Sequence, residues 1–153
     1  MNELAASTAA VVVVYRPSTS VEPTLVALQR AVGRVLVVDN HEMGSVHLAS
    51  QAARLGLPCL RVGNVGGLAG AYNRALDWLR AHAAQTLQVV FLDEDSDASS
   101  LAALLGDAAT VRALAQARTA AVAAAYRDRA TGLRGRYIRL GRLRLGFSPR
   151  EFT

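Results

Sequence analysis

Short apolar runs alternate along the chain with segments whose apolar residues recur at helical spacing. Three runs, at residues 10–15 (AVVVVY), 34–38 (RVLVV) and 89–92 (VVFL), have the length and composition of strands buried on both faces of a parallel sheet. A shorter run at residues 59–62 predicts another strand, and residues 119–126 predict a fifth. This alternation predicts an α/β fold with a Rossmann-like, open, mostly parallel sheet that carries helices on both faces.

The predicted helices are marked by residues that begin or end a helix. Their starting points are Glu22-Pro23, Ser45, the region of Leu68, and Ser99 or Ser100. Gly33 and Gly56 end the first two. The helix capped by Ser45 is expected to bury an apolar face, which comprises Val46, Ala49, Ala52 and Ala53. The last helix is expected to continue to Leu114.

The final part of the chain has a different pattern. In residues 138–147, apolar side chains are interleaved with arginines and glycines, which is typical of an amphipathic strand or hairpin. The chain is therefore divided into an α/β domain, residues 1–137, and a basic amphipathic tail, residues 138–153. An uncovered apolar edge strand is prone to pairing, so we expect self-association or a second chain to cover this edge.

Composition narrows the class of protein. A chain of 153 residues with 52% hydrophobic and 19% charged residues can bury the core of a folded domain. No apolar run approaches the ~20 residues that a membrane-spanning helix needs. Residues 1–10 carry Glu3 and no basic residue, unlike a secretory signal. The single cysteine, Cys59, excludes an internal disulfide and a cysteine-based zinc cluster. We therefore expect a cytoplasmic protein.

The basic residues are unusual in type and in place. All 17 are arginine, which excludes a Walker-type phosphate loop, a Schiff-base lysine and a receiver-type phosphorylation switch. Residues 126–153 carry eight arginines against two acids. This tail could face a lipid-linked acceptor or the inner face of a membrane, be solvated, or pair with acids of a missing half. Nucleic-acid binding is not predicted, because no aromatic stacking platform interleaves these arginines.

Polar residues follow each of the first four predicted strands. They are Tyr15-Arg16, Asp39-Asn40, Gly63-Asn64 and Asp93-Glu94-Asp95. Ligands of open parallel sheets bind at the carboxyl ends of strands, near the point where strand order reverses. Two carboxylates one residue apart can share a divalent cation that bridges a diphosphate, while Glu94 between them is expected to face water or a backbone amide. The alternative is that Asp39 and the acidic cluster only cap helices or form turns.

The glycine-rich segment GNVGGLAG, residues 63–70, matches neither the dinucleotide-binding spacing nor a phosphate loop. The first predicted turn, Arg16-Pro17-Ser18, also lacks the glycines of a nucleotide-binding dehydrogenase. Glycines in residues 63–70 are expected to allow close approach to a ligand or a neighbouring strand before a helix begins. Asn73 lies one helical turn further on, with a binding role and a packing role both open.

Taken together, VVVVYRP, VLVVDN, GNVGGLAGAYNRAL and VVFLDEDS resemble the family-2 glycosyltransferases of the GT-A fold, in particular the bacterial rhamnosyltransferase-like branch. The resemblance covers residues 10–137. It implies binding of a nucleotide-diphosphate sugar, such as a dTDP-rhamnose-like or UDP-sugar, and inverting transfer to a saccharide or lipid-linked acceptor in polysaccharide synthesis. An acceptor hydroxyl deprotonated by a carboxylate would attack the sugar carbon.

The resemblance also assigns residues to the donor site. Tyr15 and Pro17 would frame the nucleobase, and Asp39 would accept a hydrogen bond from the base or ribose. Asn64 and Gly66 would form the pocket wall, with Asn73 close by. Asp93 would approach the ribose and the metal, and Asp95 would be the principal ligand of Mg²⁺ or Mn²⁺. The resemblance assigns no catalytic base.

Two departures from the family pattern stand out. Arg16 replaces the usual Asn, and His41-Glu42 replaces the usual Gly-Ser. The acceptor site and catalytic base of the family lie in a second half that this sequence does not contain. The chain is then a piece of a longer enzyme, a truncated relative, or a subunit completed by another chain. The alternative function is a non-catalytic sugar-nucleotide-binding or assembly module that is inactive alone.

Overall fold

A computed structural model describes residues 1–17, 20–116, 138–140 and 145–147. The chain forms two compact units, residues 1–107 and residues 108–153, each of which is described by itself. The predicted fifth strand, residues 119–126, and the predicted domain boundary at residue 137 lie outside the described residues.

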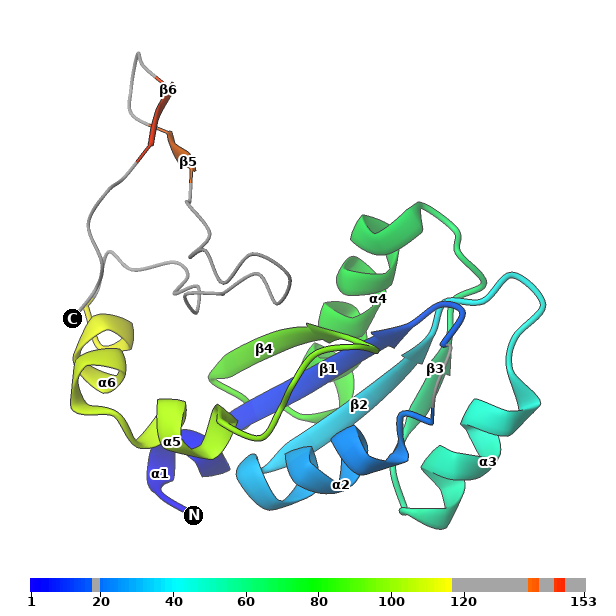
Figure 1. Ribbon diagram of the computed structural model, residues 1–153, viewed down its shortest axis with the longest axis horizontal. Coiled ribbons are helices and arrows are strands. Elements are labelled where there is room, and N and C mark those ends of the chain that lie inside the picture. The colour runs from blue at the N-terminus through cyan, green and yellow to red at the C-terminus, as the bar shows by residue number, and fades with distance from the viewer. Residues whose placement is uncertain (18–19, 117–137, 141–144, 148–153) are drawn as a thin grey trace, which may run out of the picture. The chain divides into compact units, whose positions relative to one another are not determined.

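The first unit is built on a four-stranded, all-parallel sheet in the order β3-β2-β1-β4 (Figure 1). The strands are β1 (Thr8–Val14), β2 (Arg34–Asp39), β3 (Cys59–Arg61) and β4 (Gln88–Asp93). Val14 pairs with Asp39, and Val13 pairs with Asp93. The carboxyl ends of β1, β2 and β4 therefore lie at one edge of the sheet, which confirms the predicted arrangement of the polar strand ends.

Helices cover both faces of this sheet (Figure 1). The helices of the first unit are α1 (Glu3–Ala6), α2 (Glu22–Ala31), α3 (Val46–Arg54), α4 (Gly67–His82) and α5 (Leu101–Gly106). Alternate residues of the fully buried β1 divide between two cores: Val12 and Val14 pack with α2, α3 and α5, and Val11 and Val13 pack with α4. The fold is thus the predicted Rossmann-like α/β class, and its central strand is apolar on both faces because both faces are covered.

The start of α3 is predicted correctly, but its buried face is not. The Ser45 hydroxyl accepts a hydrogen bond from the amide of Leu48 at 3.1 Å, which is the expected N-cap. Val46, predicted to be buried, is 85% exposed, whereas Leu48, Gln51 and Ala52 are buried. Ala49 and Ala53, also predicted to be buried, are exposed. The buried face of the helix is therefore rotated away from the predicted one, because the larger Leu48 is the side chain that reaches the core.

The predicted long helix after β4 is two helices. Gly106 ends α5, and Asp107 adopts an extended backbone with ψ of 129°, before α6 (Ala108–Leu114) begins in the second unit. In that unit, β5 (Ile138–Leu140) pairs antiparallel with β6 (Leu145–Phe147), so that two strands form where the sequence predicted a strand or a hairpin. Among the residues that the structure describes, no helix is both long and apolar enough to cross a bilayer.

Candidate functional site

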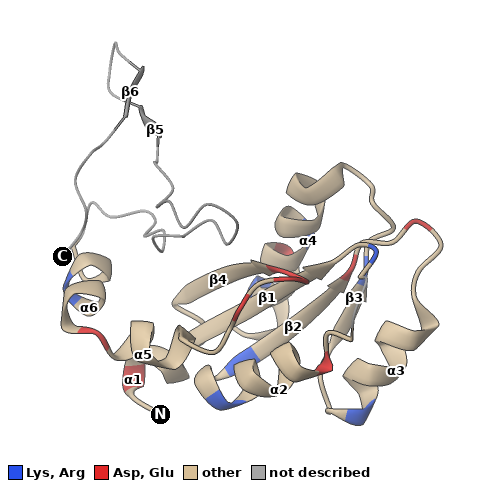
Figure 2. Cartoon of the chain, in the orientation of Figure 1, with Lys and Arg blue, Asp and Glu red and all other residues tan. Residues whose placement is uncertain are grey.

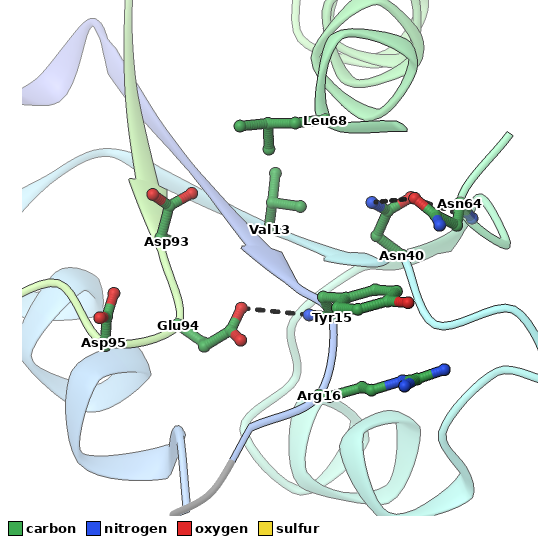
Figure 3. Close-up of a pocket in the computed structure, with 9 residues that line it drawn as sticks. All are labelled: Val13, Tyr15, Arg16, Asn40, Asn64, Leu68, Asp93, Glu94 and Asp95. Carbon is green, nitrogen blue, oxygen red and sulfur yellow. Dashed lines mark hydrogen bonds between the residues drawn. The ribbon is translucent and has the colours of Figure 1, made fainter. Parts of the chain in front are cut away.

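A pocket of about 650 Å³ lies at the carboxyl edge of the parallel sheet (Figure 3). Its lining residues are Val13, Tyr15, Arg16, Asn40, Asn64, Leu68, Asp93, Glu94 and Asp95. The pocket lies where strand order reverses, since β2 and β3 extend to one side of β1 and β4 lies on the other. This is the position at which open α/β sheets bind their ligands.

The β4 side of the pocket is acidic, as Figure 2 shows at the end of this strand and in the loop that follows. A tight turn shapes this side: the Asp93 amide donates to the Ser96 hydroxyl at 3.0 Å, and the Ser96 amide donates to the Asp93 carbonyl at 3.1 Å. Figure 3 shows Glu94 turned toward Tyr15, with the side chains of Asp93 and Asp95 turned away from it. The turn thus directs the Glu94 side chain differently from the side chains of Asp93 and Asp95.

Glu94 joins the acidic side to β1. Its carboxylate accepts a hydrogen bond from the backbone amide of Tyr15 at 3.1 Å. This bond confirms the expectation that Glu94 faces a backbone amide. It also joins the first residue after β1 to the loop after β4.

Tyr72 on α4 borders Asp93 and was not predicted as part of the site. Its ring lies against Phe91, with ring centroids 4.3 Å apart. Burial raises the pKa of Tyr72 above its ordinary value, and the charge of Asp93 and a hydrogen bond to that carboxylate raise it further. Tyr72 therefore stays a protonated phenol beside Asp93. The sequence signal of Tyr72 is that of an ordinary core position in the apolar repeat of α4.

Two asparagines form the opposite side of the pocket. The Asn64 amide donates to Asn40 Oδ1 at 3.0 Å, and Asn40 Nδ2 donates to Asn64 Oδ1 at 3.3 Å. Asn64 has a φ of 59°, a left-handed conformation that Asn tolerates better than most residues. The reciprocal bonds join the loop after β2 to the loop after β3, and Asn40 is buried to 4% exposure.

The glycine-rich segment brings α4 close to this wall. A Cβ at Gly70 would lie 2.1 Å from the backbone oxygen of Val65, so only glycine allows the first turn of α4 to pack against the preceding loop. Gly66, the N-cap of α4, has a φ of 79°. This contact is within the segment and not with a neighbouring strand, so the predicted approach to a ligand or a strand stays a prediction. Leu68, in the same turn of α4, lines the pocket.

Asp39 supports the loop that follows β2. It is buried to 3% exposure, and its carboxylate accepts hydrogen bonds from the amides of His41 at 3.1 Å and Ser45 at 2.6 Å. These bonds give Asp39 the turn-forming role that the sequence left as the alternative. The neighbouring Asn40 lines the pocket, whereas a contact of Asp39 with a base or ribose remains a prediction.

The structure brings together four of the residues that the sequence assigned to the site: Tyr15, Asn64, Asp93 and Asp95. Four other assigned residues do not line the pocket. They are Asp39, which is buried behind it, Pro17, which is exposed beyond Arg16, Gly66 at the start of α4, and Asn73, which is exposed on α4. Asn40 and Leu68 complete the lining without having been assigned. Asn40 belongs to the segment VLVVDN, and Leu68 lies at the start of the apolar repeat of α4. Neither pattern marks these two residues as pocket residues.

The donor set of the acidic side suits a hard divalent cation. Within the described parts of the chain, no group of three or more His, Cys, Asp and Glu side chains could hold a metal ion. Asp93 and Asp95 nevertheless offer two carboxylates to the same pocket. Mg²⁺ is commonly held in this way, by one or two carboxylates together with waters and the phosphates of a substrate. The pair therefore fits an ion that the ligand helps to bind.

No protein-family model matches this chain, and neither a curated protein nor a solved structure matches it. The fold and site define a Rossmann-like α/β domain with an acidic and amide-lined pocket at its topological switch point.

Proposed function

We propose that this chain is the donor-binding part of a glycosyltransferase-like protein. It would bind a nucleotide-diphosphate sugar together with Mg²⁺ or Mn²⁺, for inverting transfer to a saccharide or lipid-linked acceptor in polysaccharide synthesis in the cytoplasm. The observation that carries this proposal is that the two ends of one pocket differ in chemistry. One end has an aromatic ring and two amides, and the other has two aspartates.

The two ends suit the two halves of a nucleoside diphosphate. The Tyr15 ring offers a stacking surface for the base, and the amides of Asn40 and Asn64 offer both donors and acceptors to its edge. The volume of about 650 Å³ lies within the range usual for small-ligand pockets. In this arrangement Asp39 contributes indirectly, because its hydrogen bonds fix the loop that carries Asn40.

Asp93 and Asp95 would orient the diphosphate through the divalent cation. A bound cation of this kind neutralises the negative charge that develops on a departing diphosphate. Arg16 adds a positive charge to the pocket lining. Tyr72 stays a protonated phenol beside Asp93 and adds no negative charge to this end of the pocket.

The alternative, a module that binds sugar nucleotides without turning them over, is favoured by the use of Glu94. Inverting transfer needs a carboxylate that deprotonates the acceptor hydroxyl. Of the three acids that line the pocket, two are the proposed metal ligands, and Glu94 already accepts the Tyr15 amide. A base for catalysis would then come from residues outside this pocket.

Calorimetric titration with UDP and with dTDP tests the proposal. We expect at least one of these diphosphates to bind in Mn²⁺, and to bind roughly 100-fold more weakly when EDTA removes the metal, since the phosphates complete the coordination sphere. UMP, which lacks the second phosphate, is the matched control and should show no such metal dependence. The proposal fails if neither diphosphate binds in Mn²⁺. Release of free sugar or transfer from a bound UDP-sugar would distinguish the enzyme from the binding module.

A further inference from the structure

Glu42 joins three pocket-lining side chains without lining the pocket itself. Its Oε1 accepts hydrogen bonds from the Tyr15 hydroxyl at 2.6 Å and from Asn64 Nδ2 at 3.4 Å. Its Oε2 pairs with the Arg16 guanidinium at 3.4 Å. One carboxylate from the loop after β2 therefore contacts residues of the loops after β1 and β3.

The loop that carries Glu42 is itself held firmly. Asp39 accepts the amides on both sides of it, those of His41 and Ser45. Arg61 of β3 donates to the carbonyl of Met43 at 2.6 Å. Because the backbone on either side of Glu42 is tied down, its carboxylate is presented from a fixed position.

Of the three side chains that the Glu42 carboxylate contacts, that of Tyr15 lies at the shortest distance. The hydroxyl is held by Glu42, the backbone amide is held by Glu94 at 3.1 Å, and the Arg16 guanidinium lies 4.9 Å from the ring centroid. Figure 3 shows the ring between Arg16 and the side chain of Asn40. Without Glu42, rotation of the ring would be opposed only by contacts with its neighbours.

The charge states of the two partners agree with this bond. The pKa of Glu42 is lowered to about 2, chiefly by the hydrogen bond from Tyr15 and further by a backbone hydrogen bond and the Arg16 charge, so Glu42 is ionised at neutral pH. The same bond raises the pKa of Tyr15 above its ordinary value, because a phenolate beside the carboxylate would be repelled. The pair is therefore a phenol donating to a carboxylate throughout the neutral range.

We infer that Glu42 is a positioning residue, which fixes the Tyr15 ring as a wall of the pocket and thereby prepares the site for its ligand. Preorganisation of this kind increases affinity because less side-chain freedom is lost on binding. Only the consequence for ligand affinity rests on the proposed function, since the bond between Glu42 and Tyr15 exists without a ligand.

A ligand-free measurement tests the bond directly. We expect the ¹³Cζ resonance of Tyr15, assigned by its loss in Tyr15→Phe, to titrate at a lower pH in Glu42→Ala than in the unmodified protein. Asp77→Asn removes a charge from an exposed ion pair with Arg80 on α4 and is the matched control, which should leave the Tyr15 titration unchanged. An unchanged titration in Glu42→Ala would overturn the inference.

Binding of UDP in Mn²⁺ tests the positioning role. Glu42→Ala is expected to weaken binding about 10-fold, whereas Glu42→Gln, whose amide oxygen still accepts the hydroxyl and the Asn64 amide, should remain within about threefold. Tyr15→Phe should add little to Glu42→Ala, because both changes break one interaction. Equal loss in the Gln and Ala variants, or independent losses in the double variant, would contradict positioning. If the unmodified protein binds no nucleotide, the proposed function fails and the Tyr15 titration alone decides the role of Glu42.

Discussion

Replacement of Asp39 by alanine is expected to lower the free energy of unfolding by about 3 kcal/mol. The carboxylate is buried to 3% exposure and accepts the amides of His41 and Ser45. Its removal leaves two donors without their acceptor, and each such loss costs about 1–3 kcal/mol. The loop after β2 carries Asn40 and Glu42, so nucleotide binding should weaken together with stability.

Urea unfolding of Asp39→Ala, Asp39→Asn and Asp77→Ala measures this effect. The free energy of unfolding of Asp39→Asn should lie between those of the unmodified protein and Asp39→Ala. The Asn amide keeps one acceptor oxygen but turns a donor toward the other backbone amide. Asp77→Ala removes an exposed ion pair with Arg80 and should change stability by less than about 0.5 kcal/mol. If Asp39→Ala were as stable as Asp77→Ala, the hydrogen bonds of Asp39 would not stabilise the folded protein.

Asp95→Ala is expected to weaken the binding of UDP in Mn²⁺ by roughly 100-fold. Residues that only support a metal ligand already contribute 10–100-fold to metal affinity by the usual scale, so a direct ligand should contribute at least as much. Asp95 is exposed at the pocket, and its replacement should leave the fold intact. The loss should therefore appear in affinity and not in the urea midpoint.

The control for this change is Asp77→Asn, which removes an equal charge from α4 at a distance from the pocket lining. Titration of UDP into each variant in Mn²⁺ and in EDTA separates loss of the metal from loss of the nucleotide. In EDTA, Asp95→Ala and the unmodified protein should bind alike. Metal-dependent binding by Asp95→Ala that equals that of the unmodified protein would remove Asp95 from the metal site.

The sheet and the edge at which the pocket lies could be predicted because both depend on local patterns. Residues 10–15 are apolar at every position, which only a central strand covered on both faces requires, and β1 is that strand. Since all four strands of this sheet are parallel, the polar residues after them had to share an edge. Asp39 and Asp93 lie at that edge for this reason alone.

Helix details depended on contacts that local patterns do not specify. The predicted face of α3 was wrong because it followed Val46 and the alanines and left out Leu48, which fills the core. The helix after β4 was predicted as continuous because its leucines repeat across Gly106, where the chain leaves the helical conformation. The weak helix propensity of Gly favoured a break that the apolar repeat concealed.

The site residues divide in the same way. Asp93 and Asp95 could be assigned from their place after a strand, and both line the pocket. The contact between Tyr15 and Glu42 joins residues 27 positions apart, so no local pattern reveals it. Asp39 and Asn40 are adjacent, and their roles were decided by which side chain reached the backbone amides of the loop and which reached the pocket.

In the proposed complex, Asp93 at the end of β4 and Asp95 in the loop after it bind one ligand together with the residues after β1 and β3. Nuclear magnetic resonance of the unmodified protein with UDP tests it most directly, with Mg²⁺ and then with paramagnetic Mn²⁺. We expect UDP with Mg²⁺ to shift the resonances of the Tyr15 ring and the Asn64 side-chain amide, and Mn²⁺ to broaden the backbone amides of residues 93–95 first. Broadening centred elsewhere in the chain, or UDP-induced shifts that leave Tyr15 and Asn64 unchanged, would contradict it.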